Sequence, residues 1–165
     1  MDRKDIIYQK TANAGEAGMV QPQRELAEFN RYWRCLDDIY HDLARRQGLS
    51  DSVFIILYSL HTLGDGRSQR DICREASISK QTVHSSIRNL ERDGYLFLES
   101  GSGRDKRIWL TDSGRELVRR KICPVVALEN AAFTAMGPEA SREYLRLVGT
   151  FVRMFRELAG GLDQE

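Results

Sequence analysis

The stretch from Ser68 to Thr111 constrains the fold more than any other part of this 165-residue chain. Ser68 can cap a short helix, and Asp71 stands at the third helical position, so the two side chains can form a reciprocal capping pair. The triplet Ser77-Ile78-Ser79 interrupts this helix, and its last serine is a good cap for the next one. The order of these signals predicts two short helices joined by a tight turn.

The second helix is expected to pack one stripe on a core and to present polar side chains elsewhere. Val83, Ile87 and Leu90 follow steps of four and three residues, which places them on one helix face. Gly94 closes the helix as a C-terminal glycine. The remaining faces, and the cap, carry polar and basic residues: Ser79, Lys80, Gln81, Thr82, His84, Ser85 and Arg88.

Two β-prone runs follow, around a loop that is glycine-rich at its start and basic at its end. The runs are Tyr95-Leu96-Phe97-Leu98 and Ile108-Trp109-Leu110, and the loop between them includes Arg104, Lys106 and Arg107. This pattern is typical of a hairpin that reaches outward. Together with the two preceding helices, it predicts a winged helix-turn-helix.

A polar helix of this kind suits the major groove of double-stranded DNA. The seven residues of the second helix and its cap would meet base edges and phosphates there. Arg104, Lys106 and Arg107 would reach the backbone or a narrow minor groove from the wing. The simpler alternative is an ordinary solvated face, which the agreement of turn, helix polarity and basic wing disfavours.

The charge distribution favours a specific DNA-binding protein over a nonspecific coating protein. The chain has a formal net charge of +1. Residues 68–121 hold twelve Lys or Arg against eight Asp or Glu, a local charge of +4 that leaves −3 for the remainder. A locally basic face on a near-neutral protein fits recognition at one surface.

The flanking segments predict a helical scaffold. Pro22 suits the first turn of a long helix that ends near Gln47. Ser50 caps a second helix, over about residues 51–63, which is apolar nearly all round and is therefore expected to be buried on several sides. The apolar stripe of the first helix repeats at steps of three and four residues: Leu26, Phe29, Trp33, Leu36, Tyr40 and Leu43.

Two further helices are expected after the wing. Thr111 caps one that runs to Ala135, with a kink at Pro124 in its middle. Gly137-Pro138-Glu139 begins the last one. Its apolar seam suits a partner helix, either in the same chain or in a second subunit, where a two-fold dimer would present two recognition helices to a palindromic site. The seam consists of Leu145, Val148, Val152, Phe155 and Leu158.

We therefore expect a mainly α fold with a small two- or three-stranded β-wing, that is, a winged helix-turn-helix with long N- and C-terminal helices. The predicted divisions are a flexible N-terminal arm at residues 1–21, a winged helix-turn-helix DNA-binding region at residues 50–111, and a helical region formed by residues 22–49 and 112–165.

Several function classes receive no support from the sequence. No apolar stretch is long enough to span a membrane, and the first residues lack the apolar core of a signal peptide. No nucleophile–base–orienter set is visible, and no two histidines have metal-ligand spacing. We expect a cytoplasmic protein that is not an enzyme and has no catalytic residues, cofactor or metal.

The three cysteines, Cys35, Cys73 and Cys123, form neither a disulfide framework nor a metal-binding pattern. Cys35, with Arg31 and Arg34 beside it in sequence, is the candidate for sensing thiol oxidation. The simpler interpretation is an inert thiol in or beside the core. Cys73 and Cys123 are expected to be structural.

Over about residues 26–158 the sequence resembles the MarR family of bacterial transcriptional regulators. Leu110-Thr111-Asp112-Ser113-Gly114 matches the Leu-Thr-x-x-Gly that follows the wing in this family. An Asp-x-Arg usually precedes it, and counting back places Arg104 at the arginine and Ser102 at the aspartate. Asp105-Lys106-Arg107 lies three residues too close. Arg104 is therefore the favoured minor-groove arginine and Arg107 the rival.

The resemblance implies a homodimer, joined by its first and last helices, that binds an inverted-repeat operator and usually represses transcription. It thus implies that residues 22–49 and 112–165 form the dimerisation region, with long N- and C-terminal dimerisation helices. Many relatives release DNA when a small, often aromatic molecule binds between the dimer helices and the DNA-binding lobe, and others respond to thiol oxidation. Trp33, Leu36 and Tyr40 are the candidate lining of such a pocket, although aromatic residues at helical spacing are more often plain core. A winged-helix module that docks on a protein, and a repressor without an effector, are the alternatives.

Overall fold

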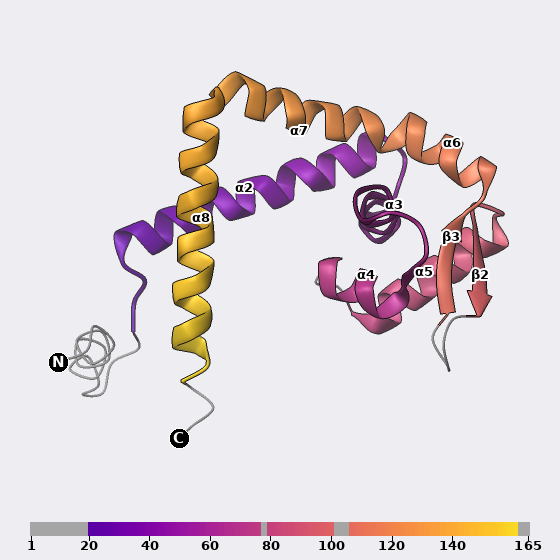
Figure 1. Cartoon of the computed structure of the whole chain (residues 1–165), viewed down its shortest axis with the longest axis horizontal. Coiled ribbons are helices and arrows are strands. Elements are labelled where there is room, and N and C mark those ends of the chain that lie inside the picture. Colours follow the sequence, from indigo (N-terminus) through magenta and orange to yellow (C-terminus); the bar gives the residue numbers. More distant parts are fainter. Residues whose placement is uncertain (1–19, 77–78, 101–105, 162–165) are drawn as a thin grey trace. The chain divides into compact units, whose positions relative to one another are not determined.

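The computed structural model describes residues 20–76, 79–100 and 106–161. It is mostly helical with one small sheet (Figure 1). The elements, in chain order, are α2 (Arg24–Arg46), α3 (Asp51–Leu63), β1 (Arg67–Ser68), α4 (Gln69–Ala76), α5 (Lys80–Arg92), β2 (Leu96–Ser100), β3 (Lys106–Leu110), α6 (Asp112–Lys121), α7 (Cys123–Met136) and α8 (Pro138–Ala159).

The chain divides into two compact units, residues 1–42 and residues 43–165. Most of the predicted N-terminal arm lies outside the described residues. In the described part of the chain, no helix is both long enough and apolar enough to cross a lipid bilayer.

Most of helix α2 belongs to the first unit, and its last residues belong to the second. Within the first unit the helix carries its apolar stripe on an exposed face. Phe29 and Trp33 stack with ring centroids 6.0 Å apart, and Trp33 remains 58% exposed. Pro22 lies two residues before the helix, so its predicted place in the first turn is wrong. Glu25 occupies that turn instead, where a carboxylate interacts favourably with the positive end of the helix dipole.

Helix α3 lies at the centre of the second unit, and its predicted burial on several sides is confirmed. The Ser50 hydroxyl caps it by accepting a hydrogen bond from the Val53 N–H, at 3.4 Å. Phe54, Ile56, Leu57 and Leu60 are buried in the core, and α4, α5 and α6 pack around the helix. The helix is thus the support on which the helix-turn-helix rests.

A hydrogen bond joins α3 to α7. The Tyr58 hydroxyl donates to Glu129 Oε2 at 2.8 Å. Burial, and then the hydrogen bond to this carboxylate and its charge, raise the pKa of Tyr58 to about 12. Because the folded chain holds the phenol proton more tightly, this contribution to stability is complete below pH 10 and is lost as the pH rises toward 12.

The two capped helices predicted around the turn are confirmed. The Ser68 N–H donates to Asp71 Oδ2 at 3.0 Å, and the Asp71 N–H donates to the Ser68 hydroxyl at 3.2 Å, which completes the reciprocal pair. The Ser79 hydroxyl accepts from the Thr82 N–H at 3.1 Å and begins α5. After α5, Gly94 takes a φ of 77°, a left-handed conformation that suits glycine. Ser77 and Ile78 lie outside the described residues.

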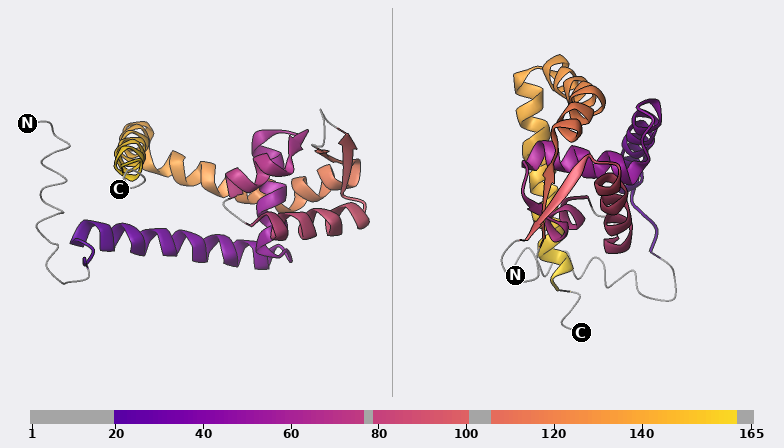
Figure 2. Two further views of the ribbon diagram at one scale, coloured as in Figure 1. Left: turned by 90° about the horizontal axis from the view of Figure 1, so that it is seen from below. Right: turned by 90° about the vertical axis from the view of Figure 1, so that its right-hand side faces the viewer.

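The sheet has three antiparallel strands in the order β1-β3-β2, which agrees with the predicted small wing. Figure 2 shows the strands of the wing in two further views. In the register, Ile108 of β3 lies opposite Leu98 of β2 and opposite Arg67 of β1. Strand β3 begins at Lys106 and includes Arg107, so these two residues belong to a strand rather than to the loop. Arg104 lies outside the described residues.

The junction after the wing explains the Leu-Thr-x-x-Gly sequence. The Thr111 hydroxyl donates to the Gly94 carbonyl at 2.7 Å and accepts from the Gly114 N–H at 3.0 Å, while the Thr111 N–H donates to the Tyr95 carbonyl at 3.1 Å. A Cβ on Gly114 would lie 2.0 Å from that same Tyr95 oxygen. Only glycine therefore allows α6 to begin against the end of α5.

The single kinked helix predicted from Thr111 to Ala135 is wrong, because the structure has two helices. Helix α6 ends at Lys121 and α7 begins at Cys123, with Ile122 between them. Pro124 stands in the first turn of α7. Proline lacks an N–H, and its ring collides with the carbonyl of the residue four positions earlier, so the first helix stops and a new one begins.

Helix α8 begins with Pro138, as predicted, and exposes a broad apolar face. Leu145 is 57% exposed and Phe155 is 63% exposed. Phe151 and Phe155 stack with their ring centroids 5.9 Å apart. The seam predicted from the sequence is therefore uncovered along much of the helix in the single chain.

We predict that Gly114→Ala lowers the free energy of unfolding by about 3 kcal/mol or more, because the new methyl group meets a backbone oxygen that already accepts a hydrogen bond. Gly149→Ala is the matched control. Gly149 lies inside α8 with no atom within 4 Å of its Cβ position, so the same change should stabilise the chain by about 0.5–1 kcal/mol. Urea titration followed by circular dichroism measures both, and equal effects of the two changes would contradict this account of the junction.

Candidate nucleic-acid interface

The burial of one stripe of α5 decides which of its side chains are available outside. Val83, Ile87 and Leu90 are 0%, 3% and 4% exposed, as the stripe predicts. On the same helix, the Ser86 hydroxyl donates to the Ser52 hydroxyl of α3 at 2.9 Å. These contacts fix the rotation of α5 about its axis.

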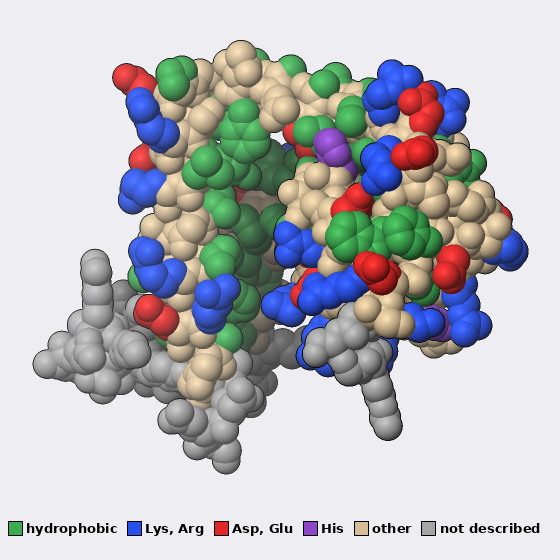
Figure 3. All heavy atoms as spheres, turned by 45° about the vertical axis from the view of Figure 1, so that its right-hand side comes forward, with side chains coloured by type: hydrophobic (Ala, Val, Ile, Leu, Met, Phe, Trp, Pro, Cys, Tyr) green, Lys and Arg blue, Asp and Glu red, His purple; other side chains and the backbone are tan. Residues whose placement is uncertain are grey.

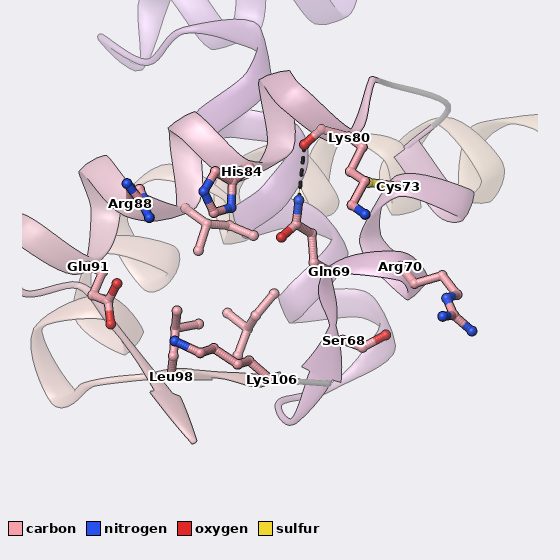
Figure 4. Close-up of a pocket in the computed structure, with 12 residues that line it drawn as sticks. Ser68, Gln69, Arg70, Cys73, Lys80, His84, Arg88, Glu91, Leu98 and Lys106 are labelled. Carbon is pink, nitrogen blue, oxygen red and sulfur yellow. Dashed lines mark hydrogen bonds between the residues drawn. The ribbon is translucent and has the colours of Figure 1, made fainter. Parts of the chain in front are cut away.

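A second row of α5 is exposed and basic. Lys80, His84 and Arg88 follow one another at four-residue steps, so they lie along one face of the helix. This row borders a surface hollow of about 470 Å³ between α4, α5 and the wing strands β2 and β3. Figure 4 shows His84 and Arg88 on one side of the hollow and Lys106 of β3 on the other.

Lys106 and Arg107 lie on opposite faces of β3, although both were predicted to contact DNA from the wing. Side chains alternate between the faces of a strand. Lys106 lies on the same face of β3 as buried Ile108 and lines the hollow. Arg107 lies on the opposite face, where its guanidinium donates to the Gly66 carbonyl at 3.0 Å.

Three hydroxyl groups near the start of α5 are engaged within the helix. The Ser79 and Thr82 hydroxyls are 2.8 Å apart, and the Ser85 hydroxyl donates to the Thr82 carbonyl at 3.0 Å. Gln81 is exposed and does not border the hollow. The basic row and Lys106 therefore come together, while these four predicted residues lie beside them on the first turns of the helix.

Sequence reasoning missed residues that α4 and the end of α5 contribute to the hollow. Gln69, Arg70 and Cys73 come from α4, and Glu91 comes from α5. The available signals were the place of Gln69 and Arg70 directly after the Ser68 cap, and the three-residue step from Arg88 to Glu91 on one helix face. Whether α4 borders the hollow depends on how the helices pack in three dimensions, and no local sequence pattern indicates it.

The Lys and Arg side chains that border the hollow differ from those of α6 in whether a carboxylate pairs with them. Arg119 pairs with Glu116 at 2.7 Å, and Arg115 pairs with Asp65 at 3.1 Å. Within the described ranges, by contrast, Lys80, Arg88 and Lys106 form no ion pair with a carboxylate. In Figure 3, Lys and Arg side chains gather at the lower end of the winged-helix region, residues 50–111. This positive charge is available to an anionic partner.

One acidic group beside the hollow is part of the scaffold. Hydrogen bonds from Ser68, first from its N–H and then from its hydroxyl, lower the pKa of Asp71, and the charges of Arg74 and Arg107 act in the same direction. The carboxylate thus stabilises the start of α4 above its ordinary pKa of 3.8. This contribution is lost as the pH falls through the lowered pKa of the folded chain.

The other candidate residues lie elsewhere. Trp33, Leu36 and Tyr40 are exposed on α2, and none of them borders this hollow or the smaller one beside His61. Cys35 is exposed, Cys73 is partly buried, and Cys123 Sγ lies 3.8 Å from His61 Nε2. Among the residues that the structure describes, no group of three His, Cys, Asp or Glu side chains is placed to hold a metal ion.

Comparisons with known proteins agree with the fold and with the sequence resemblance. Residues 47–108 match the sequence model of the MarR family. A MarR family regulator from Neisseria meningitidis superposes with a TM-score of 0.73 at 18% identity, covering 84% of this chain and 98% of that one. No curated protein matches the chain significantly.

Two further solved structures share the fold. The S. aureus MepR–DNA complex superposes with a TM-score of 0.60 at 20% identity, covering 84% of this chain and 99% of that one. Bordetella bronchiseptica BpsR, whose DNA binding is regulated by 6-hydroxynicotinic acid, gives a TM-score of 0.59 at 18% identity, covering 82% and 99%. The resemblance to the MarR family is therefore confirmed, and the fold is the winged helix of its regulators.

The different positions of Lys106 and Arg107 lead to a prediction about stability. Arg107→Ala should lower the free energy of unfolding by about 1 kcal/mol, because the Gly66 carbonyl loses its donor and β1 loses a tie to β3. Lys106→Ala, the matched control one residue away, should change it by less than about 0.5 kcal/mol. Chemical unfolding of both variants measures this. A larger loss for Lys106→Ala than for Arg107→Ala would contradict the assignment.

Proposed function

We propose that the chain is a sequence-specific transcriptional regulator that binds double-stranded DNA. One observation carries the proposal: Lys80, His84 and Arg88 of a capped, core-anchored helix converge with Lys106 of the wing on one hollow. The three Lys and Arg side chains of this set have no carboxylate partner among the described residues. The structural likeness to MepR, which is described in complex with DNA, supports it.

In the proposed complex, α5 enters the major groove with its N-terminal turns toward the bases. Lys80, Gln81 and His84 read base edges, and the hydroxyls of Ser79, Thr82 and Ser85 lie close to the backbone. Arg88 and Lys106 contact phosphates on either side of the hollow. From the wing, Arg104 is favoured over Arg107 for the minor groove, because the Arg107 guanidinium is bound to Gly66.

We further propose that two chains pair through their terminal helices and bind a palindromic operator as a homodimer. The support is the apolar face of α8, which is uncovered in the single chain. Exposed apolar faces of this extent mark association surfaces. A two-fold axis would present two copies of α5 to successive turns of the duplex.

Regulation belongs to the same proposal. The chain acts in the cytoplasm, where it represses transcription by occupying an operator. A small aromatic effector would bind near Trp33, Leu36 and Tyr40 and release the DNA. The regulation of BpsR by 6-hydroxynicotinic acid supports an aromatic acid as the first compound to test. Oxidation of Cys35 is the alternative signal, and its exposure is consistent with that role.

We predict that Arg88→Ala and Lys106→Ala weaken DNA binding mainly by removing phosphate contacts. Each should lower the slope of log affinity against log salt concentration by about one and weaken all sequences alike. Fluorescence anisotropy with a duplex from the chain's own upstream region, at several salt concentrations, measures this. Arg142→Ala on α8 is the control and should leave the slope unchanged. A wild-type chain with no salt-dependent duplex binding would refute the proposal and favour a protein-docking module.

The dimer is tested at α8. Leu145→Glu places a charge in the apolar seam, and it should convert the dimer to monomers and weaken operator binding at least tenfold, because each monomer then reads one half-site alone. Arg153→Glu introduces the same residue on the polar side of the same helix and should leave the dimer intact. Sedimentation velocity reports the mass of each. A wild-type chain that sediments as a monomer would contradict pairing through α8.

A further inference from the structure

We propose that Gln69 is a positioning residue for sequence recognition, which acts by fixing the first turn of α5. The inference rests on the proposed function. Gln69 is the first residue of α4, and its side-chain amide Nε2 donates to the carbonyl oxygen of Lys80, the first residue of α5, at 3.0 Å. This bond joins residues eleven apart in sequence and crosses the turn between the two helices (Figure 4).

The backbone from which the Gln69 side chain extends is anchored on both sides of the Ser68–Gln69 junction by neighbouring elements. Gln69 directly follows Ser68, which is fixed by three hydrogen bonds with Asp71, at 2.8, 3.0 and 3.2 Å. Ser68 also belongs to β1, which pairs with β3 of the wing. The Gln69 side chain therefore extends from a point that the capping pair and the sheet both anchor.

The acceptor end lies at the start of α5, ahead of the buried stripe that begins at Val83. The buried stripe and the bond from Ser86 to Ser52 hold the middle of the helix. Its first turn has the Ser79 cap, which is local to α5 itself, and the Gln69 bond, which comes from another element. Helix ends fray more readily than helix centres, so a tie at this carbonyl acts on the turn that carries Lys80 and His84.

The first turn of α5 should matter more for discrimination between DNA sequences than for overall affinity for DNA. A bidentate contact to a base edge requires the donor and acceptor of the side chain to match those of one base, whereas a phosphate contact carries no sequence information. Loosening the first turn of α5 should therefore reduce the preference for one sequence over another and leave nonspecific binding nearly unchanged.

The first experiment uses no DNA. Gln69→Leu removes the donor and keeps a side chain of similar size, and Gln23→Leu, outside the winged-helix region, is the control for the same substitution. Amide hydrogen exchange in the full chain should become at least fivefold faster at Val83 and His84 in Gln69→Leu, with no change at Ile87 and Leu90. Unchanged exchange at Val83 and His84 would overturn the inference, whatever the chain binds.

The second experiment measures discrimination. The probes are a duplex selected by the wild-type chain from a random library and the same duplex with its sequence scrambled. Gln69→Leu should reduce the ratio of the two affinities about tenfold, with the salt slope and the thermal midpoint unchanged. A parallel loss of both affinities with a lower thermal midpoint would show a merely structural role and overturn the inference.

A double-mutant cycle with Lys80→Ala separates positioning from direct contact. If Gln69 acts through the first turn of α5, its effect on the affinity ratio should shrink when the Lys80 side chain is absent, because the turn then positions one base-reading side chain fewer. Additive effects would mean that Gln69 contacts the DNA independently and would overturn the inference. A wild-type chain that selects no sequence refutes the proposed function, and the exchange experiment still decides whether Gln69 holds the turn.

Discussion

The structure depends on the packing of one stripe of α5 against the core around α3. Because Val83, Ile87 and Leu90 are buried, the rotation of α5 about its axis is fixed, and Lys80, His84 and Arg88 lie exposed beside the buried stripe. Apolar burial has no preferred direction by itself. On a helix it fixes an orientation, because residues four apart share a face. The position of the basic row is thus a consequence of the core, because it follows from where the apolar stripe lies.

A second constraint fixes the wing relative to that helix. The Tyr95 carbonyl, directly after the turn that ends α5, accepts from the Thr111 N–H at the start of α6, and Gly114 allows the close approach. Asp65 adds to the same arrangement by accepting from the Leu110 N–H at 3.2 Å and from Arg115 at 3.1 Å. Lys106 therefore extends from a strand whose far end is tied both to the end of α5 and to the scaffold.

Sequence reasoning succeeded where the signal was local. The caps at Ser50, Ser68, Ser79 and Thr111 and the buried stripe of α5 could all be predicted, because each depends on residues within one helical turn. It failed where a partner was distant: β1 depends on pairing with β3, and the place of Gln69 depends on α4 meeting α5. At Pro124 the local signal was present, but whether a proline kinks or divides a helix depends on how the flanking segments pack.

The break at Ile122 separates the helix that follows the wing from the last two helices. The break separates α6, which is tied to the wing through Thr111, from α7, which leads to α8. The Tyr58–Glu129 bond spans it, because Tyr58 belongs to the helix that supports α5 and Glu129 to the helix beyond the break. Helix α7 is also tied to α8, because the Ser141 hydroxyl donates to the Phe133 carbonyl at 3.0 Å across Gly137. The two hydrogen bonds therefore connect the helix that supports α5 with the helix that carries the exposed apolar face.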